Sequence, residues 1–159
     1  MSFFYAKKFA IFVSNKKLTM YHILQKFHSG WAYLALLLMV VAVVNAMIGK
    51  FTKREFKPLD RKISLFAMVS IHVQLLVGLI LYFVSPLGLA SLGNMTDKLL
   101  RTTSLEHPVT NLIAITLITV GWSKHKSALT DDDKFKKIMF FYGIGLLLIL
   151  SKIPWKLWV

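Results

Sequence analysis

Residues 31–48 read WAYLALLLMVVAVVNAMI, an apolar run without a charged side chain. A helix that crosses the apolar core of a bilayer needs about 20 residues at roughly 1.5 Å of rise each. Three further apolar runs follow at 63–84, 109–122 and 138–150, and the last two reach full length only with their polar flanks. Four such runs leave almost no chain to shield them from water. The sequence therefore predicts an all-α protein, an integral membrane up-and-down four-helix bundle.

This four-helix transmembrane domain is expected to occupy residues 20–159. Its spans are predicted at about 30–49, 63–84, 107–123 and 137–153. The preceding residues 1–19 form a basic N-terminal extension. Two interpretations of it stay open: Met20 is the true start of the protein, or the extension is an interfacial segment.

The composition excludes several classes of protein. Of the 159 residues, 56% are hydrophobic, and 20 Lys and Arg outnumber 7 Asp and Glu, for a formal net charge of +13. A soluble domain of this length would be more polar, and a nucleic-acid-binding protein would be less apolar. The chain has no cysteine, which excludes disulfides, cysteine-ligated iron–sulfur clusters and thiol chemistry. Any metal or cofactor must therefore be held by histidine, methionine, carboxylates or other non-thiol groups.

Cations collect in alternate connections between the predicted spans. Segments 50–62 and 123–137 carry six and five Lys or Arg, whereas segments 85–106 and 151–159 carry two each. Cytoplasmic loops are enriched in such residues. This rule places the first and third loops in the cytoplasm and both termini outside. Five lysines ahead of the first span oppose this orientation, because they would have to be translocated.

Smaller features predict local structure near the third loop and the fourth span. The run Asp131–Asp133 is expected to be a solvated acidic cap near the start of a helix, where carboxylates are favoured. Gly143 and Gly145 predict close helix packing in the fourth span. His125 lies between two lysines in a predicted cytoplasmic loop and is expected to be solvated.

Two histidines begin the first and third spans, His28 and His107. An up-and-down topology places both at the same membrane face, predicted to be the outer one, on helices that are usually diagonal in a four-helix bundle. Two imidazoles at one level can supply both axial ligands of a haem. Lys26, Lys98 and Arg101 are nearby cations for its propionates. The alternative is that both histidines are simply polar residues of the interface.

A polar residue one helical turn beyond His107 shares its face of the helix. Asn111 follows at i+4, and Ala114 at i+7 is small enough to leave room for a ring or a close helix. We expect Asn111 to orient a ligand or to hydrogen-bond across the bundle.

The most deeply placed histidine is His72, near the middle of the second span. Ionisable residues within a membrane usually face the protein interior and have a function. The expected depth of His72 is some 15 Å below His28 and His107, for about ten residues of helix. Four roles of His72 stay open: it replaces one of the two outer ligands, binds a second group, belongs to a quinone site, or is structural. A further alternative is that the predicted span boundaries, and with them this depth, are misplaced.

Four motifs carry a resemblance to a known family. The motifs are His28-Ser29-Gly30-Trp31, His72-Val73-Gln74-Leu75-Leu76-Val77-Gly78, Glu106-His107 and Ile153-Pro154-Trp155. Together they resemble a family of small bacterial four-helix membrane proteins labelled cytochrome-b-like, over about residues 20–155. More distantly, the spacing is similar to that of four-helix membrane protoporphyrinogen oxidases and copper-resistance-type membrane domains. The resemblance implies a bacterial inner-membrane protein with haem b, and His28, His72 and His107 as ligand candidates.

The function expected from these observations is electron transfer by a small membrane protein that binds haem b, with quinone as a partner. Two alternatives stay open. Short loops and the lack of an extramembrane domain fit a non-redox accessory subunit that packs against a larger envelope membrane complex. The distant resemblance implies a tetrapyrrole-oxidising membrane enzyme. Motifs for nucleotide binding, zinc proteases and serine hydrolases are absent from the sequence.

Overall fold

The computed structural model describes the backbone of residues 2–157 and the side chains of residues 18–157. Within this range the chain is helical, with no strand. The main helices are α1 (Ser2–Phe51), α2 (Pro58–Val84), α4 (His107–Lys126) and α5 (Asp131–Ser151). Shorter elements complete the chain: η1 (Leu89–Ser91), α3 (Lys98–Arg101), the π-helical turn η2 (Thr102–Glu106) and η3 (Trp155–Leu157).

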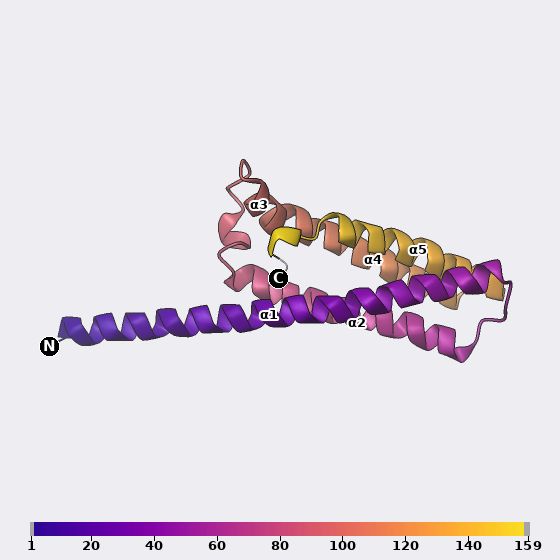
Figure 1. Cartoon of the computed structure of the whole chain (residues 1–159), viewed down its shortest axis with the longest axis horizontal. Helices are drawn as coiled ribbons and strands as arrows, with labels where there is room; N and C mark the ends of the chain where they lie inside the picture. The colour runs from indigo at the N-terminus through magenta and orange to yellow at the C-terminus, as the bar shows by residue number, and fades with distance from the viewer. Residues whose placement is uncertain (1, 158–159) are drawn as a thin grey trace.

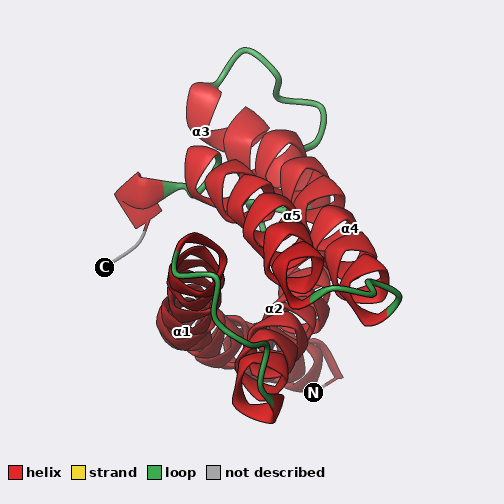
Figure 2. Ribbon diagram, turned by 90° about the vertical axis from the view of Figure 1, so that its right-hand side faces the viewer, coloured by secondary structure: helices red, strands yellow, loops and turns green. Residues whose placement is uncertain are grey.

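The four main helices form an up-and-down bundle (Figure 1, Figure 2). Helix α1 packs against α2 and α5, and α4 packs against the same two helices. As predicted, the first and third spans are therefore diagonal to each other. Two helices, Leu18–Phe51 of α1 and Pro58–Val84 of α2, are long and apolar enough to cross a membrane.

Helix α1 is longer than the predicted first span at its N-terminal side. It runs without interruption from Ser2, through the expected boundary at residue 19, and its first part projects beyond the bundle (Figure 1). No Pro or Gly precedes Gly30, so nothing in the sequence ends the helix earlier. The expected interfacial role of residues 1–19 depends on side chains that lie mostly outside the described set.

The first loop is fixed by a buried carboxylate. Asp60, only 3% exposed, sits in the first turn of α2 just after Pro58. Its two oxygens accept hydrogen bonds from both terminal nitrogens of Arg54, at 2.6 and 2.7 Å, and from the side-chain amide of Asn45 at 2.8 Å. The backbone N–H of Lys57 also donates to it, at 2.8 Å. Asp60 therefore joins the end of α1, the loop and the start of α2.

The loop between α4 and α5 ends in an N-terminal helix cap. Thr130 precedes α5, and its side-chain oxygen accepts from the backbone N–H of Asp133 at 3.1 Å. Three carboxylates follow in the first turn, where they stabilise the helix dipole. The predicted acidic cap at Asp131–Asp133 is confirmed.

Small side chains are frequent in the bundle interior, beside larger ones such as Phe135 and Tyr142, and many large apolar side chains face outward. The buried set includes five alanines, at positions 35, 42, 46, 67 and 114, together with Ser64 and Ser70. In contrast, Phe66, Leu76 and Leu147 are each at least 60% exposed. Monomeric soluble proteins rarely expose apolar patches of this extent. Close approach of helices at small residues is also typical of helix packing within membranes.

Gly145 allows α5 to approach α4, whereas Gly143 does not take part in this contact. A Cβ atom at Gly145 would lie 2.5 Å from Cγ1 of Ile118, but one at Gly143 would meet no atom within 4 Å. The prediction of close packing is thus confirmed for Gly145 and wrong for Gly143, because residues two apart on a helix face different directions.

A pair of alanine substitutions tests this packing. Gly145→Ala should lower the free energy of unfolding by about 1–3 kcal/mol, the usual cost of overpacking. Gly143→Ala is the matched control and should be neutral or stabilising, because alanine is the better helix former. Denaturation of the purified proteins in mixed micelles measures both, and equal stability of the two variants would contradict the packing described here.

Candidate functional site

A cavity of about 210 Å³ lies between α1, α2 and α4 and is closed on one side by the segment after α5. Its wall is mostly apolar, with Leu75, Ile115 and Ile153 among its residues. A few polar side chains converge on it. These are His28, Gln74, Tyr82, His107 and Asn111. An apolar cavity with few convergent polar groups is the usual form of a ligand or cofactor site.

His28 is seated against α2 at a glycine. A Cβ atom at Gly78 would lie 3.1 Å from Cε1 of His28, so the missing side chain makes room for the imidazole. One turn earlier on α2, the amide nitrogen of Gln74 donates to the backbone oxygen of His28 at 3.0 Å and lies 3.2 Å from Nδ1 of its ring. The other amide atom, Oε1 of Gln74, is buried without a hydrogen-bond partner among the described residues.

His107 is oriented by the end of α5. Pro154 cannot continue a helix, and α5 stops at Ser151, which leaves the carbonyl of Lys152 available. Nδ1 of His107 lies 2.9 Å from this oxygen. Because a carbonyl only accepts, the proton is assigned to Nδ1, and Nε2 keeps its lone pair. Histidine ligands of metals commonly donate their second ring N–H in this way.

Asn111 contacts His107 from within α4, and none of its hydrogen bonds within the described residues crosses the bundle, as one expected alternative required. Its amide nitrogen donates to the backbone oxygen of His107 at 2.7 Å, and its approach to Nδ1 at 3.0 Å is a contact between two donors when Nδ1 carries the proton. His107 itself follows directly on the π-helical turn η2. Such turns are rare and are frequently found at functional sites.

The two imidazoles face each other across the diagonal of the bundle. The ring centres of His28 and His107 are 6.4 Å apart, and the ring planes are inclined by 81°. This pair joins residues 79 positions apart in the sequence. Within the described residues, no group of three or more His, Cys, Asp or Glu side chains is placed to hold a metal ion. The cavity thus offers two histidine nitrogen ligands and no third ligand of these types.

Arg101 does not line the cavity. Its Nε donates to Oε1 of Glu106 at 2.9 Å, and a terminal nitrogen donates to the backbone oxygen of Met95 at 2.9 Å. Nζ of Lys152 donates to the second oxygen of Glu106 at 3.0 Å. Glu106, the residue before His107, is therefore bound both to α3 and to the segment that follows α5. Lys26 and Lys98 are exposed and do not line the cavity either.

Acid should weaken the ion pairs that Glu106 forms with Arg101 and Lys152. Hydrogen bonds from Lys152 and Arg101 lower the pKa of Glu106 below its ordinary value of 4.5. The ionised carboxylate therefore adds stability above that value, and this contribution is lost as the pH falls through the lowered pKa. The difference in melting temperature between wild type and Glu106→Gln should be largest near neutral pH and shrink toward about pH 4. A difference that does not change with pH would contradict the ion-pair role.

His72 lies outside the cavity. Its Nδ1 is 2.8 Å from the backbone oxygen of Met68, and its Nε2 is 3.3 Å from the hydroxyl of Thr119 on α4. The expected depth of some 15 Å agrees with the structure relative to His107, because Thr119 is twelve residues from His107, or about 18 Å of helix rise. Relative to His28 it is too large. His28 contacts α2 at Gln74 and Gly78, which are two and six residues from His72, or about 3 to 9 Å of helix rise.

His125 is buried rather than solvated. Only 2% of it is exposed, since its ring packs against Trp122 at 4.4 Å and Phe56 at 5.8 Å between ring centres. The two flanking lysines point to water from the next positions of the helix, but the ring faces inward. The prediction that His125 is solvated is therefore wrong, because it relied on the charges of the neighbouring residues in the sequence.

Sequence reasoning missed three cavity residues of α2 that lie near His28, namely Gln74, Gly78 and Tyr82. They share one helical face at spacings of four residues, the periodicity that identifies a common face. His72 is off this face. A helical projection centred on Gly78 would have selected Gln74 over His72 as the partner of the first helix.

No protein-family model, curated protein or solved structure matches this chain. The fold and the site define its class in structural terms: an all-helical four-helix bundle with a paired-histidine cavity near one end.

Proposed function

We propose that this chain is an integral membrane protein that crosses the bacterial inner membrane four times, binds haem b between His28 and His107, and passes electrons. The observation that carries the proposal is the pairing of these imidazoles at 6.4 Å on diagonal helices. His28 and His107 would hold the metal of a haem through one ring nitrogen each, and the separation of their ring centres leaves room for one atom between the two nitrogens.

The surroundings of the histidine pair support the same assignment. A bare metal ion such as Zn²⁺ needs three or four protein ligands, which the described residues do not offer here. The carbonyl of Lys152 holds the ring proton of His107 away from the metal-binding nitrogen. The side-chain amide nitrogen of Gln74 lies 3.2 and 3.3 Å from the two ring nitrogens of His28, and its Oε1 is buried without a partner among the described residues, so exchange of the amide N and O positions would turn an acceptor toward the ring. The cavity wall is mostly apolar, as the faces of a porphyrin require, and the present volume of about 210 Å³ would have to widen to admit the whole ring.

Electron transfer is the chemistry that this ligand set would support, because a bound haem would supply a reversible one-electron couple. His28 and His107 would hold it, and the apolar wall around them would keep water away. A quinone dissolved in the bilayer is the proposed partner.

The outward-facing side chains support membrane insertion. Phe66, Leu76 and Leu147 are exposed on the bundle surface, and lipid is the solvent in which such a surface is stable. The cation-rich loops 50–62 and 123–137 lie at one end, which we assign to the cytoplasm with both termini outside. Because the chain lacks cysteine, single cysteines at Lys53 and Met95 can be tested for labelling from each side of the membrane. Labelling of both from one side would contradict this topology.

Haem binding is tested by titration of the purified protein with haem b. The Soret band should saturate at one haem per chain. A difference spectrum without a saturating band would contradict the proposal, while leaving membrane insertion to the labelling experiment.

A further inference from the structure

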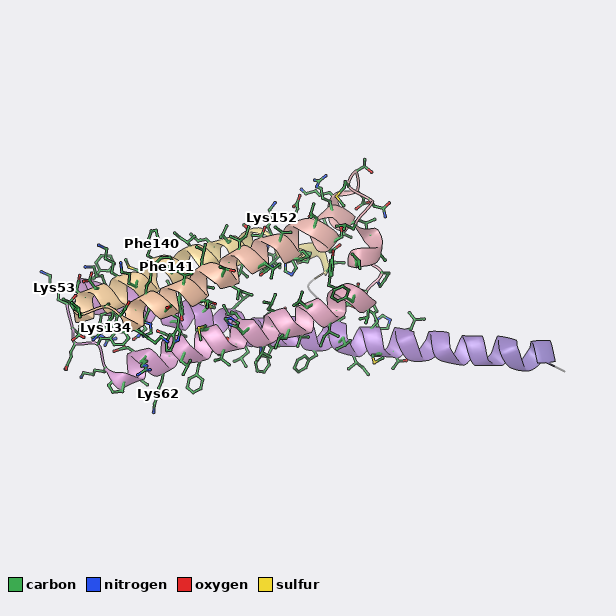
Figure 3. All side chains as sticks on the ribbon, turned by 180° about the vertical axis from the view of Figure 1, so that it is seen from behind. Lys53, Lys62, Lys134, Phe140, Phe141 and Lys152 are labelled. Atoms are coloured by element: carbon green, nitrogen blue, oxygen red, sulfur yellow. The ribbon has the colours of Figure 1, made fainter. Side chains whose placement is uncertain are left out.

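The opposite end of the bundle contains a second, basic pocket. It lies between the first loop and the end of α4, and its volume is about 360 Å³. Its lining is formed by Phe56, Lys57, Pro58, Arg61, His125, Lys126 and Lys134. Figure 3 shows Lys134 at this end of the bundle with Lys53 and Lys62, far from Lys152. Four of the seven lining residues are cations, drawn from the loop, α2, α4 and α5.

Three of these cations have no anionic partner. Elsewhere in the described chain, Lys50, Arg54 and Lys152 each pair with a carboxylate. No such ion pair is formed by Lys57, Arg61 or Lys126 within the part of the chain that the structure describes. Lys134 is held by Asp131 at 2.9 Å. The other carboxylate in contact with the lining, Asp60, accepts from the backbone N–H of Lys57 and is paired with Arg54. The pocket therefore keeps an excess of positive charge.

His125 shows that these cations converge. Its ring lies at the pocket, buried beneath Phe56, and Nδ1 is 2.6 Å from the backbone oxygen of Trp122. Burial lowers the pKa of His125, and the charges of Arg61, Lys126 and Lys134 lower it further. Three cations from α2, α4 and α5 thus act on one buried ring, an arrangement that an anion between them would stabilise.

We propose that this pocket binds the phosphate headgroup of an anionic phospholipid from the cytoplasmic leaflet. Basic pockets between membrane helices on the cytoplasmic side bind such headgroups. Arg61 and Lys126 contact the phosphate, and the apolar surface of Phe56 and Pro58 lies beside the glycerol backbone. The site relies on the proposed membrane insertion and not on the proposed haem.

The test is native mass spectrometry of the full chain in a non-ionic detergent with added phosphatidylglycerol or phosphatidylcholine. Wild type should bind phosphatidylglycerol in preference to phosphatidylcholine. Each basic residue near an anionic lipid contributes roughly a fivefold factor in binding, so the double variant Arg61→Gln/Lys126→Gln should bind about 25-fold more weakly. The matched control is Lys53→Gln/Lys62→Gln, which removes the same charge from the same end outside the pocket lining and should retain the affinity of wild type.

Three results would overturn the proposal. Equal losses in the two double variants would mean that surface charge, and not the pocket, attracts the lipid. Equal binding of the two lipids would remove the requirement for an anion. Displacement of phosphatidylglycerol by millimolar inorganic phosphate would identify a soluble ligand instead of a lipid. Melting temperatures of both variants verify that they fold, and a chain that stays monodisperse without detergent would contradict membrane insertion separately from the pocket.

Discussion

Replacing His28 and His107 together by alanine should abolish the saturable Soret band of the haem-loaded protein. With both imidazoles removed, Asn111 and Gln74 are the remaining polar side chains nearest to the pair, and an amide is a poor ligand for haem iron. Each single variant, His28→Ala or His107→Ala, should retain one ligand and bind haem more weakly, with a shifted band. Absorption spectra during titration with haem measure all three variants.

The matched control for this experiment is His72→Ala. His72 is also a histidine of the bundle, but its ring contacts Met68 and Thr119 and lies outside the cavity. Its removal should leave the Soret band and the stoichiometry unchanged. If His72→Ala removes the band while either cavity variant keeps it, the ligand assignment is wrong. Melting temperatures of the haem-free proteins separate loss of ligand from loss of fold.

The largest loss of stability is expected for Asp60→Asn. Asparagine is similar in size, but it removes the charge that faces Arg54 and sets an amide N–H₂ group against the donors that now surround the carboxylate. Removing one partner of a buried ion pair costs about 3–5 kcal/mol. The side chain of Arg54 is 32% exposed and recovers some hydration, so we expect about 3 kcal/mol, at the lower end of this range.

Asp132→Asn provides the comparison for this loss. Asp132 also pairs with a cation of the α1 end, Lys50, but its side chain is 49% exposed. An exposed ion pair contributes about 0–1 kcal/mol. Denaturation in mixed micelles should therefore separate the two variants by at least about 2 kcal/mol. Equal losses would show that Asp60 does not organise the first loop as its four hydrogen bonds indicate.

Local sequence signals predicted the helices well where a capping signal is present. The acidic run Asp131–Asp133 begins α5 and Glu106-His107 marks the start of α4, as expected, whereas α2 begins at Pro58, inside the segment 50–62 that was predicted to be a loop. The start of α1 was missed, because the polar residues between 14 and 29 are all compatible with a helix and none stops it.

The site was predictable only in part, for a geometric reason. The two histidines were placed at the same face by topology, and the structure brings their rings together at 6.4 Å. Their partners are set by the rotation of each helix about its own axis, which hydrophobicity determines poorly when lipid and interior are both apolar. Hence the backbone carbonyl of Lys152 could not be assigned to His107, and the only signal for Gln74 was the spacing of four residues that it shares with Gly78. The buried state of His125 was missed because its sequence neighbours are charged.

Electron paramagnetic resonance of the oxidised, haem-loaded protein tests the central claim most directly. With His28 and His107 as the two axial ligands, the ferric iron should give a low-spin signal in wild type and in His72→Ala, since two imidazoles impose a strong ligand field. Each single cavity variant should give a high-spin signal instead. A high-spin signal in wild type, or a low-spin signal that survives the loss of either cavity histidine, would contradict the assignment.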